Sequence, residues 1–245
     1  MSEAARSAVI TGGASGIGKA TCELLARNGC AVLVADRDEA GAKKVAQAIG
    51  GQACAVDVAD EASVVALFDY AARALNGRID GLATAAGIAD MTPFMDIDVA
   101  TWRRVHEINV IGTYLCIREA AKRMRPGGRI CTVASVAGKR GGGLSGTAAY
   151  AASKGAVIQL TRGAARSLAK AGIAVNSVAP GPVLTPMLAG HFEDPQARAR
   201  VEALTLVGRS AEPLEIAEAI AWLLSPASSF VDGETLTVDG GIVLD

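Results

Sequence analysis

The chain has 245 residues, enough for an α/β domain that buries a large core without disulfide or metal staples. Its 24 lysines and arginines nearly balance its 25 aspartates and glutamates, which predicts no basic face and no nucleic-acid partner. No apolar run has the length of a membrane span, and five scattered cysteines without a C-x-x-C pair predict neither a metal site nor a disulfide framework.

Short β-branched runs alternate with helical patterns from one end of the chain to the other. Residues 1–6 are polar and run straight into the first strand, so we expect no signal peptide and a cytoplasmic protein. The predicted strands are 7–11, 31–35, 52–56, 81–85, 129–133, 173–178 and 234–238, and several are apolar throughout, as parallel strands covered on both faces are. Helical patterns cover 16–28, 61–75 and 150–170, with Asp60 as an N-cap and Gly29 and Gly172 as stops. We therefore predict one α/β domain over residues 1–245, a Rossmann-type, doubly wound, seven-stranded parallel sheet with helices on both faces.

A glycine-rich segment joins the first strand to the first helix, reading Thr11-Gly-Gly-Ala-Ser-Gly-Ile-Gly18. Glycines allow a tight turn and the close approach of a pyrophosphate to backbone N–H groups, and the helix N-terminus adds a partial positive charge. An ordinary glycine-rich turn is the alternative, but the position between strand and helix favours dinucleotide binding. The residues expected to contact the cofactor here are Gly12, Ser15, Gly16, Ile17 and Gly18.

Asp36 ends the second strand, 18 residues after Gly18. A carboxylate at this point accepts hydrogen bonds from the adenosine ribose and repels a 2′-phosphate, although a solvated acid at the start of the next helix is the alternative. The sequence therefore predicts NAD over NADP, while Arg37 could in principle meet a phosphate. Asp57 and Val58, after the third strand, are weaker candidates for the adenine edge.

Tyr150 and Lys154 lie four residues apart, on one face of a predicted helix. A phenol titrates near a pKa of about 10, and a neighbouring ammonium is expected to lower the pKa of Tyr150 towards neutrality. This spacing alone is common in amphipathic helices. However, Ser135 follows the fifth strand at its carboxyl end, where such sheets collect ligands. Asn109, a mediocre helix former, lies in a long predicted helix, either hydrogen-bonded in the core or distorting the helix to hold a water.

Taken together and in this order, the motifs closely resemble those of the short-chain dehydrogenase/reductase family, in its single-domain branch. The resemblance implies that Tyr150 exchanges the substrate proton, Ser135 polarises the carbonyl oxygen, and Lys154 holds the nicotinamide ribose and depresses the pKa of Tyr150. It also implies that Asn109 positions a water in a proton relay, which completes a catalytic tetrad. Further cofactor contacts implied by the family are Ala86, Gly87, Tyr150, Lys154, Pro180, Gly181, Val183 and Thr185.

Two stretches depart from the family pattern. Thr84-Ala85-Ala86-Gly87 stands where the family usually carries Asn-Asn-Ala-Gly, so the tie made by the second Asn must be replaced or lost. The segment between Ser135 and Tyr150 is slightly longer than usual, and we expect residues 138–147 to form a flexible loop beside the active site.

Three segments are expected to border the substrate: 136–149, 87–94 and 187–206, the last of them a mobile lid. Side chains that suggest an apolar wall in this lid are Met187, Leu188, Phe192, Leu204 and Leu206. His191 is a candidate substrate contact, with an exposed lid histidine as the alternative. A neutral secondary alcohol, sugar alcohol or cyclic ketone fits best.

We therefore predict an enzyme with NAD as cofactor that moves a hydride between the nicotinamide and a small-molecule secondary alcohol or ketone. The alternatives are an NADPH-dependent reductase of 3-oxoacyl thioesters and a non-catalytic NAD-binding regulatory protein. The family resemblance also implies a homotetramer that pairs through residues 99–124, residues 150–170 and the last strand.

Overall fold

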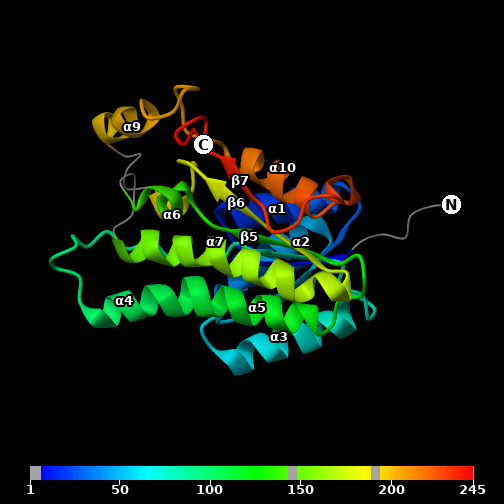
Figure 1. The fold of residues 1–245 in the computed structure, drawn as a ribbon. Coiled ribbons are helices and arrows are strands. Elements are labelled where there is room, and N and C mark those ends of the chain that lie inside the picture. Colours follow the sequence, from blue (N-terminus) through cyan, green and yellow to red (C-terminus); the bar gives the residue numbers. More distant parts are fainter. Residues whose placement is uncertain (1–6, 143–147, 189–193, 245) are drawn as a thin grey trace.

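The computed structural model describes residues 7–142, 148–188 and 194–244. Seven parallel strands form one sheet in the order β3-β2-β1-β4-β5-β6-β7 (Figure 1). They are β1 (Ser7–Thr11), β2 (Ala31–Asp36), β3 (Gln52–Ala55), β4 (Gly81–Thr84), β5 (Arg129–Val133), β6 (Ala174–Pro180) and β7 (Thr235–Val238). The order reverses between β1 and β4, and in such sheets the crevice beyond the carboxyl ends at the reversal is where ligands bind.

Helices cover both faces of the sheet. Helices α1 (Gly16–Arg27), α2 (Glu39–Ile49) and α10 (Pro213–Leu223) pack on one face, and α3 (Glu61–Ala74), α5 (Gly112–Ala121) and α7 (Ala148–Leu168) pack on the other. The remaining α-helices of the described chain are α4 (Val99–His106), α6 (Val136–Arg140) and α9 (Pro195–Glu202). Strand side chains alternate between two buried apolar clusters, with Val9 and Leu82 in one and Ile10 and Ala83 in the other. The predicted doubly wound parallel sheet is confirmed.

Local signals in the sequence also match the structure. The Asp60 side chain accepts a hydrogen bond from the N–H of Ala62 and caps α3. Gly172 has the left-handed conformation after the short helix that extends α7, and Gly29 has φ +79° directly after the end of α1. In both places a side chain would strain the backbone, which is why the helices end there.

Two segments differ from expectation. The long helix expected around Asn109 is interrupted, because a five-residue π-helical turn at Glu107–Ile111 joins α4 to α5. The segment expected as a loop after Ser135 begins with α6, whose first turn is capped by the Ser135 side chain. Helix propensity does not predict this helix, because residues 138 and 141–143 are glycines. A capped single turn depends on local hydrogen bonds rather than on composition.

No helix within the described residues is long and apolar enough to cross a membrane. All five cysteines, at positions 22, 30, 54, 116 and 131, are free thiols. In the same part of the chain, no group of three or more His, Cys, Asp or Glu residues could hold a metal ion.

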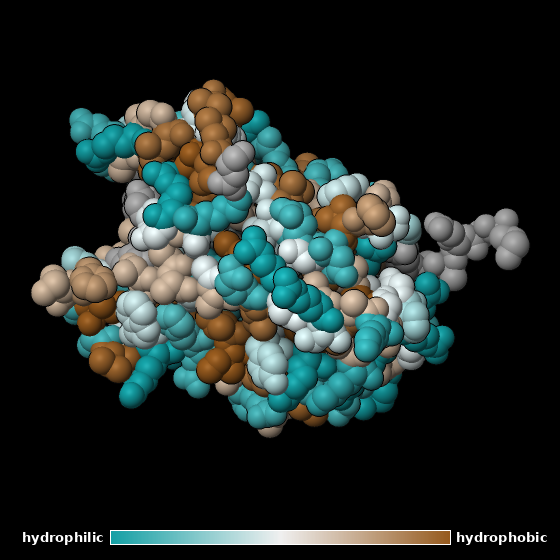
Figure 2. Space-filling model, in the orientation of Figure 1, coloured by the Kyte–Doolittle hydropathy of each residue, from teal (hydrophilic) through white to brown (hydrophobic). Residues whose placement is uncertain are grey.

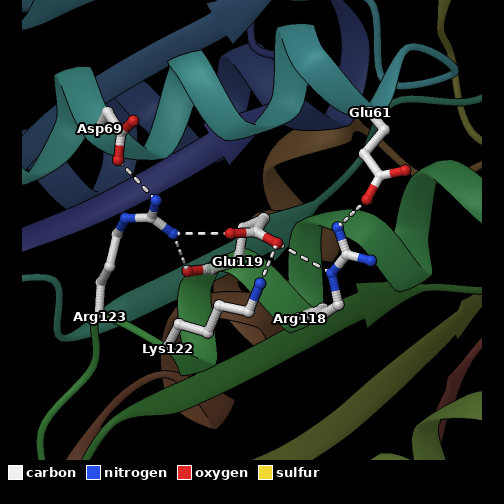
Figure 3. Close-up of polar contacts among 6 residues, drawn as sticks. All are labelled: Glu61, Asp69, Arg118, Glu119, Lys122 and Arg123. Atoms are coloured by element: carbon white, nitrogen blue, oxygen red, sulfur yellow. Dashed lines mark hydrogen bonds and ion pairs between the residues drawn. The ribbon is translucent and has the colours of Figure 1, made fainter.

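A buried glutamate ties α5 to α3 (Figure 3). The Glu119 carboxylate is 2% exposed and accepts hydrogen bonds from three cationic side chains of its own helix region, while two acidic side chains of α3 hold two of these cations from the other side. The six residues are Glu61, Asp69, Arg118, Glu119, Lys122 and Arg123. Burial raises the pKa of Glu119, but the hydrogen bonds from Lys122, Arg123 and Arg118 outweigh it and hold the pKa at about 2.

We expect Glu119→Gln to lower the free energy of unfolding at pH 7 by about 3 kcal/mol, because it leaves three clustered cations without their buried counter-charge. Since the folded-state pKa of Glu119 is depressed from 4.5 to about 2, this contribution is present above pH 4.5 and is lost as the pH falls through that interval. Urea unfolding at pH 7 and pH 3 measures both effects. Glu61→Gln, at a side chain 64% exposed, is the control and is expected to cost less than about 1 kcal/mol. An equal decrease in the free energy of unfolding for Glu119→Gln and Glu61→Gln would contradict the prediction.

Candidate active site

A cleft of about 280 Å³ opens at the carboxyl ends of the central strands. It brings together all of the predicted cofactor contacts, from the glycine-rich loop, the ends of β2 and β3, the segments after β4 and β6, and α7, together with Ser135. Asn109 is the predicted site residue that does not line it. Ile88, Ala89 and Met187 also line it, from two of the segments expected to border the substrate. Cleft residues that the sequence did not single out for the site are Val56, Ala85, Ile108, Val133, Ala134 and Pro186. Most are chain neighbours of predicted residues, which is the only signal that could have found them.

The glycine-rich loop is held by contacts that only glycine allows. A Cβ on Gly12, which has φ +71°, would lie 2.6 Å from the backbone nitrogen of Ala86. A Cβ on Gly18 would overlap the carbonyl group of Gly12, 2.7 Å from its carbon atom. The loop therefore folds tightly over the start of α1 and leaves the helix N-terminus open to the cleft, as a pyrophosphate site requires.

Backbone contacts hold the segment after β4 against the glycine-rich loop. The N–H of Ala85 donates to the carbonyl of Thr11 at 3.0 Å, and the Ala85–Ala86 backbone lies against Gly12. The hydroxyls of Thr11 and Thr84, which occupy neighbouring register positions of β1 and β4, are buried and make no hydrogen bond. The segment after β4 is thus held by main-chain packing, and two buried hydroxyls beside it have no hydrogen-bond partner.

Asp36 is fixed at the rim of the cleft by two backbone donors. Its Oδ2 accepts from the N–H of Ala14 in the glycine-rich loop, and its Oδ1 accepts from the N–H of Asp38, each at 3.0 Å. Each carboxylate oxygen keeps lone pairs that can accept further hydrogen bonds. Arg37 and Asp57 line the cleft beside it. The carboxylate is therefore preorganised to bind hydroxyl groups.

Ser135, Tyr150 and Lys154 meet at the inner end of the cleft. The Ser135 hydroxyl is hydrogen-bonded to the Tyr150 phenol, and the Lys154 ammonium lies 5.8 Å from the centre of the Tyr150 ring. Burial raises the pKa of Tyr150, and the hydrogen bond from Ser135 lowers it by a smaller amount. The expected lowering of the Tyr150 pKa by Lys154 is therefore wrong for the protein by itself, because desolvation of the phenolate dominates.

Lys154 is a buried ammonium with a backbone partner. Its Nζ donates to the carbonyl oxygen of Val133 at 2.7 Å, at the end of β5. Burial lowers the pKa of Lys154 to about 8, which leaves the ammonium largely charged at neutral pH yet close to its titration range. Lys154 can thus donate hydrogen bonds in the cleft and also gain or lose a proton under mild conditions.

Asn109 lies behind the cleft, in the π-helical turn. Its amide bonds the backbone of Ile88 in both directions, accepting from the N–H and donating to the carbonyl, each at 2.9 Å, and also donates to Ser153 Oγ at 3.0 Å. Ser153 in turn donates to the carbonyl of Tyr150 at 2.7 Å. Asn109 therefore ties the segment after β4 to α7. Both Nδ2 hydrogens of Asn109 are used, so its side chain has no donor left for the expected water. Ser153, which lies between Tyr150 and Lys154 in the sequence, is a linking residue that the sequence did not reveal.

Apolar side chains surround the open end of the site. Ile88, Ala89 and Met187 line the same cleft as the catalytic candidates. Strongly exposed apolar side chains within or directly after the segments 87–94 and 187–206 are Met91, Phe94, Met95, Leu206 and Val207. Figure 2 shows apolar surface around α9 and around the start of α4, with a hollow between them. His191, Phe192 and residues 143–147, which were expected at the substrate, lie outside the described residues.

Comparison with known proteins gives consistent matches over the full length. Residues 12–243 match the protein family described as Enoyl-(Acyl carrier protein) reductase. The chain is 47% identical to a cis-4-hydroxycyclohexanecarboxylate dehydrogenase of Sinomonas cyclohexanicum, over 97% of this chain and 96% of that protein. It is 40% identical to a cyclopentanol dehydrogenase of Comamonas testosteroni, over 95% of each. Among solved structures, a short-chain dehydrogenase/reductase of Brucella melitensis, titled glucose/ribitol dehydrogenase, superposes with a TM-score of 0.92 at 34% identity, covering 98% of this chain and 97% of that one.

Proposed function

This chain belongs to the short-chain dehydrogenase/reductase family and is an oxidoreductase of CH–OH groups with a nicotinamide cofactor; from that premise we propose that it is an NAD(H)-dependent dehydrogenase of ring-shaped secondary alcohols, with Tyr150 as the acid/base. The observation that carries the proposal is the convergence of Ser135, Tyr150 and Lys154 in the cleft that the glycine-rich loop closes.

The proposed preference for NAD is supported by the carboxylate of Asp36. Its position is set by the N–H groups of Ala14 and Asp38, so it cannot swing away without losing both hydrogen bonds. Ribose hydroxyls can donate to its free lone pairs, whereas a 2′-phosphate would meet like charge at short range. The tight approach of Gly12 and Gly18 and the open N-terminus of α1 fit the pyrophosphate of the same dinucleotide.

When bound, the nicotinamide supplies the acceptor or the donor of the hydride that the substrate carbon loses or gains. In the oxidation direction, Tyr150 takes the hydroxyl proton of the alcohol, and in reduction it returns that proton to the carbonyl oxygen. Ser135 Oγ accepts a hydrogen bond from the N–H of Ala137 at 3.1 Å, so its single hydrogen is available to the Tyr150 phenol and, when the substrate binds, to the substrate oxygen. Lys154 places a positive charge beside the phenol and has N–H donors for the cofactor ribose.

A carbocyclic substrate is supported by the apolar lining and by the relatives. Ile88, Ala89 and Met187, from the segments expected to border the substrate, are among the apolar residues that line the cleft. A polyol would leave its additional hydroxyls without partners against these side chains, which costs binding energy, whereas a hydrocarbon ring needs none. The two dehydrogenases compared above are named for a cyclohexane and a cyclopentane alcohol.

The proposal is tested by initial rates of NADH formation with cyclopentanol, cyclohexanol, cis-4-hydroxycyclohexanecarboxylate, galactitol and a 3-hydroxyacyl thioester, with NADP in parallel. NAD-linked turnover of the ring alcohols, with kcat/KM at least about 100-fold above galactitol, is the expected result. Turnover of the thioester with NADP alone would overturn the proposal in favour of a ketoacyl reductase. Binding of NADH without turnover of any substrate class would favour a regulatory protein.

We expect Asp36→Ala to weaken NADH binding by about 10- to 100-fold, because one or two charge-assisted hydrogen bonds to the ribose are lost. NADPH binding should improve, since the repulsion of the 2′-phosphate is removed. Dissociation constants from fluorescence titration measure both. Asp38→Ala is the matched control, because Asp38 caps α2 through the N–H of Gly41 and does not line the cleft. An unchanged ratio of NADH to NADPH affinity in Asp36→Ala would show that Asp36 does not select the cofactor.

A further inference from the structure

The short helix that carries Ser135 at its N-terminus rests directly on the backbone of α7. A Cβ on Gly138 would lie 2.5 Å from the nitrogen of Gly155 and 2.6 Å from the carbonyl carbon of Lys154. Both atoms are main-chain atoms in the interior of a 21-residue helix, so they cannot give way as a flexible side chain would. Gly138 has an ordinary backbone conformation, so it is space and not φ that excludes a side chain here.

Lys154 clamps the Ser135 segment at both ends. Its side chain reaches forward to the carbonyl oxygen of Val133, two residues before Ser135, at 2.7 Å. Its main-chain carbonyl group lies against Gly138, three residues after Ser135. The position of Ser135 relative to α7, and hence to Tyr150, is therefore fixed from both sides by one residue of the same helix.

The direction of the Ser135 hydroxyl is set by the same short helix. Its oxygen accepts from the N–H of Ala137 as the cap of α6 and is hydrogen-bonded to the phenol of Tyr150. Ala137 is buried, and the N–H of Gly141 closes the helix on the Ala137 carbonyl at 2.9 Å. If α6 shifts, the donor that orients the hydroxyl shifts with it.

We propose that Gly138 is a positioning residue for the reaction: its missing side chain lets α6 lie against Lys154 and Gly155, and this contact holds the Ser135 hydroxyl at Tyr150 and the substrate oxygen. The inference rests on the proposed roles of Ser135 and Tyr150. Gly138 itself does not line the cleft, so it acts through Ser135 alone.

A methyl group at position 138 should displace α6 and leave α7 in place. Helix α6 has five residues, whereas α7 has 21 and packs against α4, α5, β5 and β6. The catalytic serine therefore moves, while Tyr150 and Lys154 keep their places in the cleft. The binding contacts of the cofactor with the glycine-rich loop and with Asp36 lie on other elements and are not touched.

The test is Gly138→Ala, measured with the best ring alcohol and NAD. We expect kcat to fall by about 100-fold, as a displacement of the order of 1 Å costs, with the NADH dissociation constant within about twofold of wild type. The midpoint of the pH profile of alcohol oxidation should move to higher pH, because the hydrogen bond from Ser135 is what lowers the pKa of Tyr150. In combination with Ser135→Ala, the glycine substitution should add no further loss, since both remove the same interaction.

Two further variants keep the test decisive. Gly163→Ala makes the same change in α7 where no atom lies within 4 Å, and should leave kcat and the pH profile unchanged. Gly155→Ala strains the same contact from the other side and more mildly, with its Cβ 3.3 Å from the carbonyl oxygen of Gly138, and serves if Gly138→Ala does not fold. It should reduce kcat several-fold and be equally non-additive with Ser135→Ala.

The proposal is overturned if Gly138→Ala lowers thermal stability but keeps the wild-type kcat and pH midpoint, which is what a purely structural glycine would do. It is also overturned if its effect on kcat multiplies with that of Ser135→Ala. Absence of alcohol turnover in the wild-type protein would instead contradict the proposed function, so the two failures are distinguishable.

Discussion

Replacing Tyr150 by phenylalanine is expected to reduce kcat for alcohol oxidation by about 1,000-fold or more, while NADH still binds with nearly wild-type affinity. The change removes the one phenolic oxygen that the Ser135 hydroxyl contacts in the cleft and leaves the ring in its place. Because burial raises the pKa of Tyr150, the wild-type oxidation rate should rise with pH as the phenolate forms, and this limb of the profile should vanish in the variant. Stopped-flow or steady-state rates between pH 6 and 11 measure both effects.

The chain offers matched controls, because it has only two other tyrosines, Tyr70 and Tyr114. Both lie outside the cleft, so Tyr70→Phe and Tyr114→Phe should keep kcat within about twofold of wild type. Turnover that survives in Tyr150→Phe, or a pH limb that persists there, would remove Tyr150 from its proposed role.

The second large effect is expected from Gly18→Ala, which should weaken NADH binding by at least about 100-fold. The added Cβ would overlap the carbonyl group of Gly12, so α1 and the loop must separate, at a cost of about 3 kcal/mol, which is about a factor of 100 in affinity. The N–H groups of the loop then no longer converge on the pyrophosphate. Calorimetric titration with NADH measures the loss, and far-ultraviolet circular dichroism checks that the fold is kept.

Gly163→Ala is again the control for a helical glycine, and it should bind NADH like wild type, because no atom lies near its Cβ position. A Gly18→Ala protein that binds NADH normally would mean that the loop tolerates the separation, and that the tight turn is not what forms the pyrophosphate site.

The strands and the cofactor residues are what the sequence predicted best. A strand buried on both faces is a short, unbroken apolar run, and β1 and β5 were predicted at 7–11 and 129–133 as they are found. The expected cofactor residues all line the cleft, because glycine spacing and strand ends place them at one edge of the sheet. Their individual roles, the NAD preference and the homotetramer stay predictions.

Features that depend on a distant partner could not be read from the chain. The π-helical turn contains Asn109, whose side chain is hydrogen-bonded to the backbone of Ile88, 21 residues earlier in the sequence. The raised pKa of Tyr150 follows from burial, which a motif does not report. Pro186 and Ala134 also line the cleft and carry no chemical signature that the sequence could have shown. In each case the missing information is tertiary.

The π-helical turn between α4 and α5 also bears on how this protein can evolve. It contains one residue more than a regular α-helical turn would, and such turns are rare and occur mostly singly within α-helices, frequently at functional sites. Losing one residue from Glu107–Ile111 would give a more regular helix, but it would rotate α4 against α5 by about 100° and carry Asn109 away from Ile88. Helix regularity and the position of Asn109 therefore oppose each other at this turn. A sequence optimised for helix regularity would lose this π-helical turn. Consensus or computational stabilisation of this enzyme should therefore leave Glu107–Ile111 unchanged.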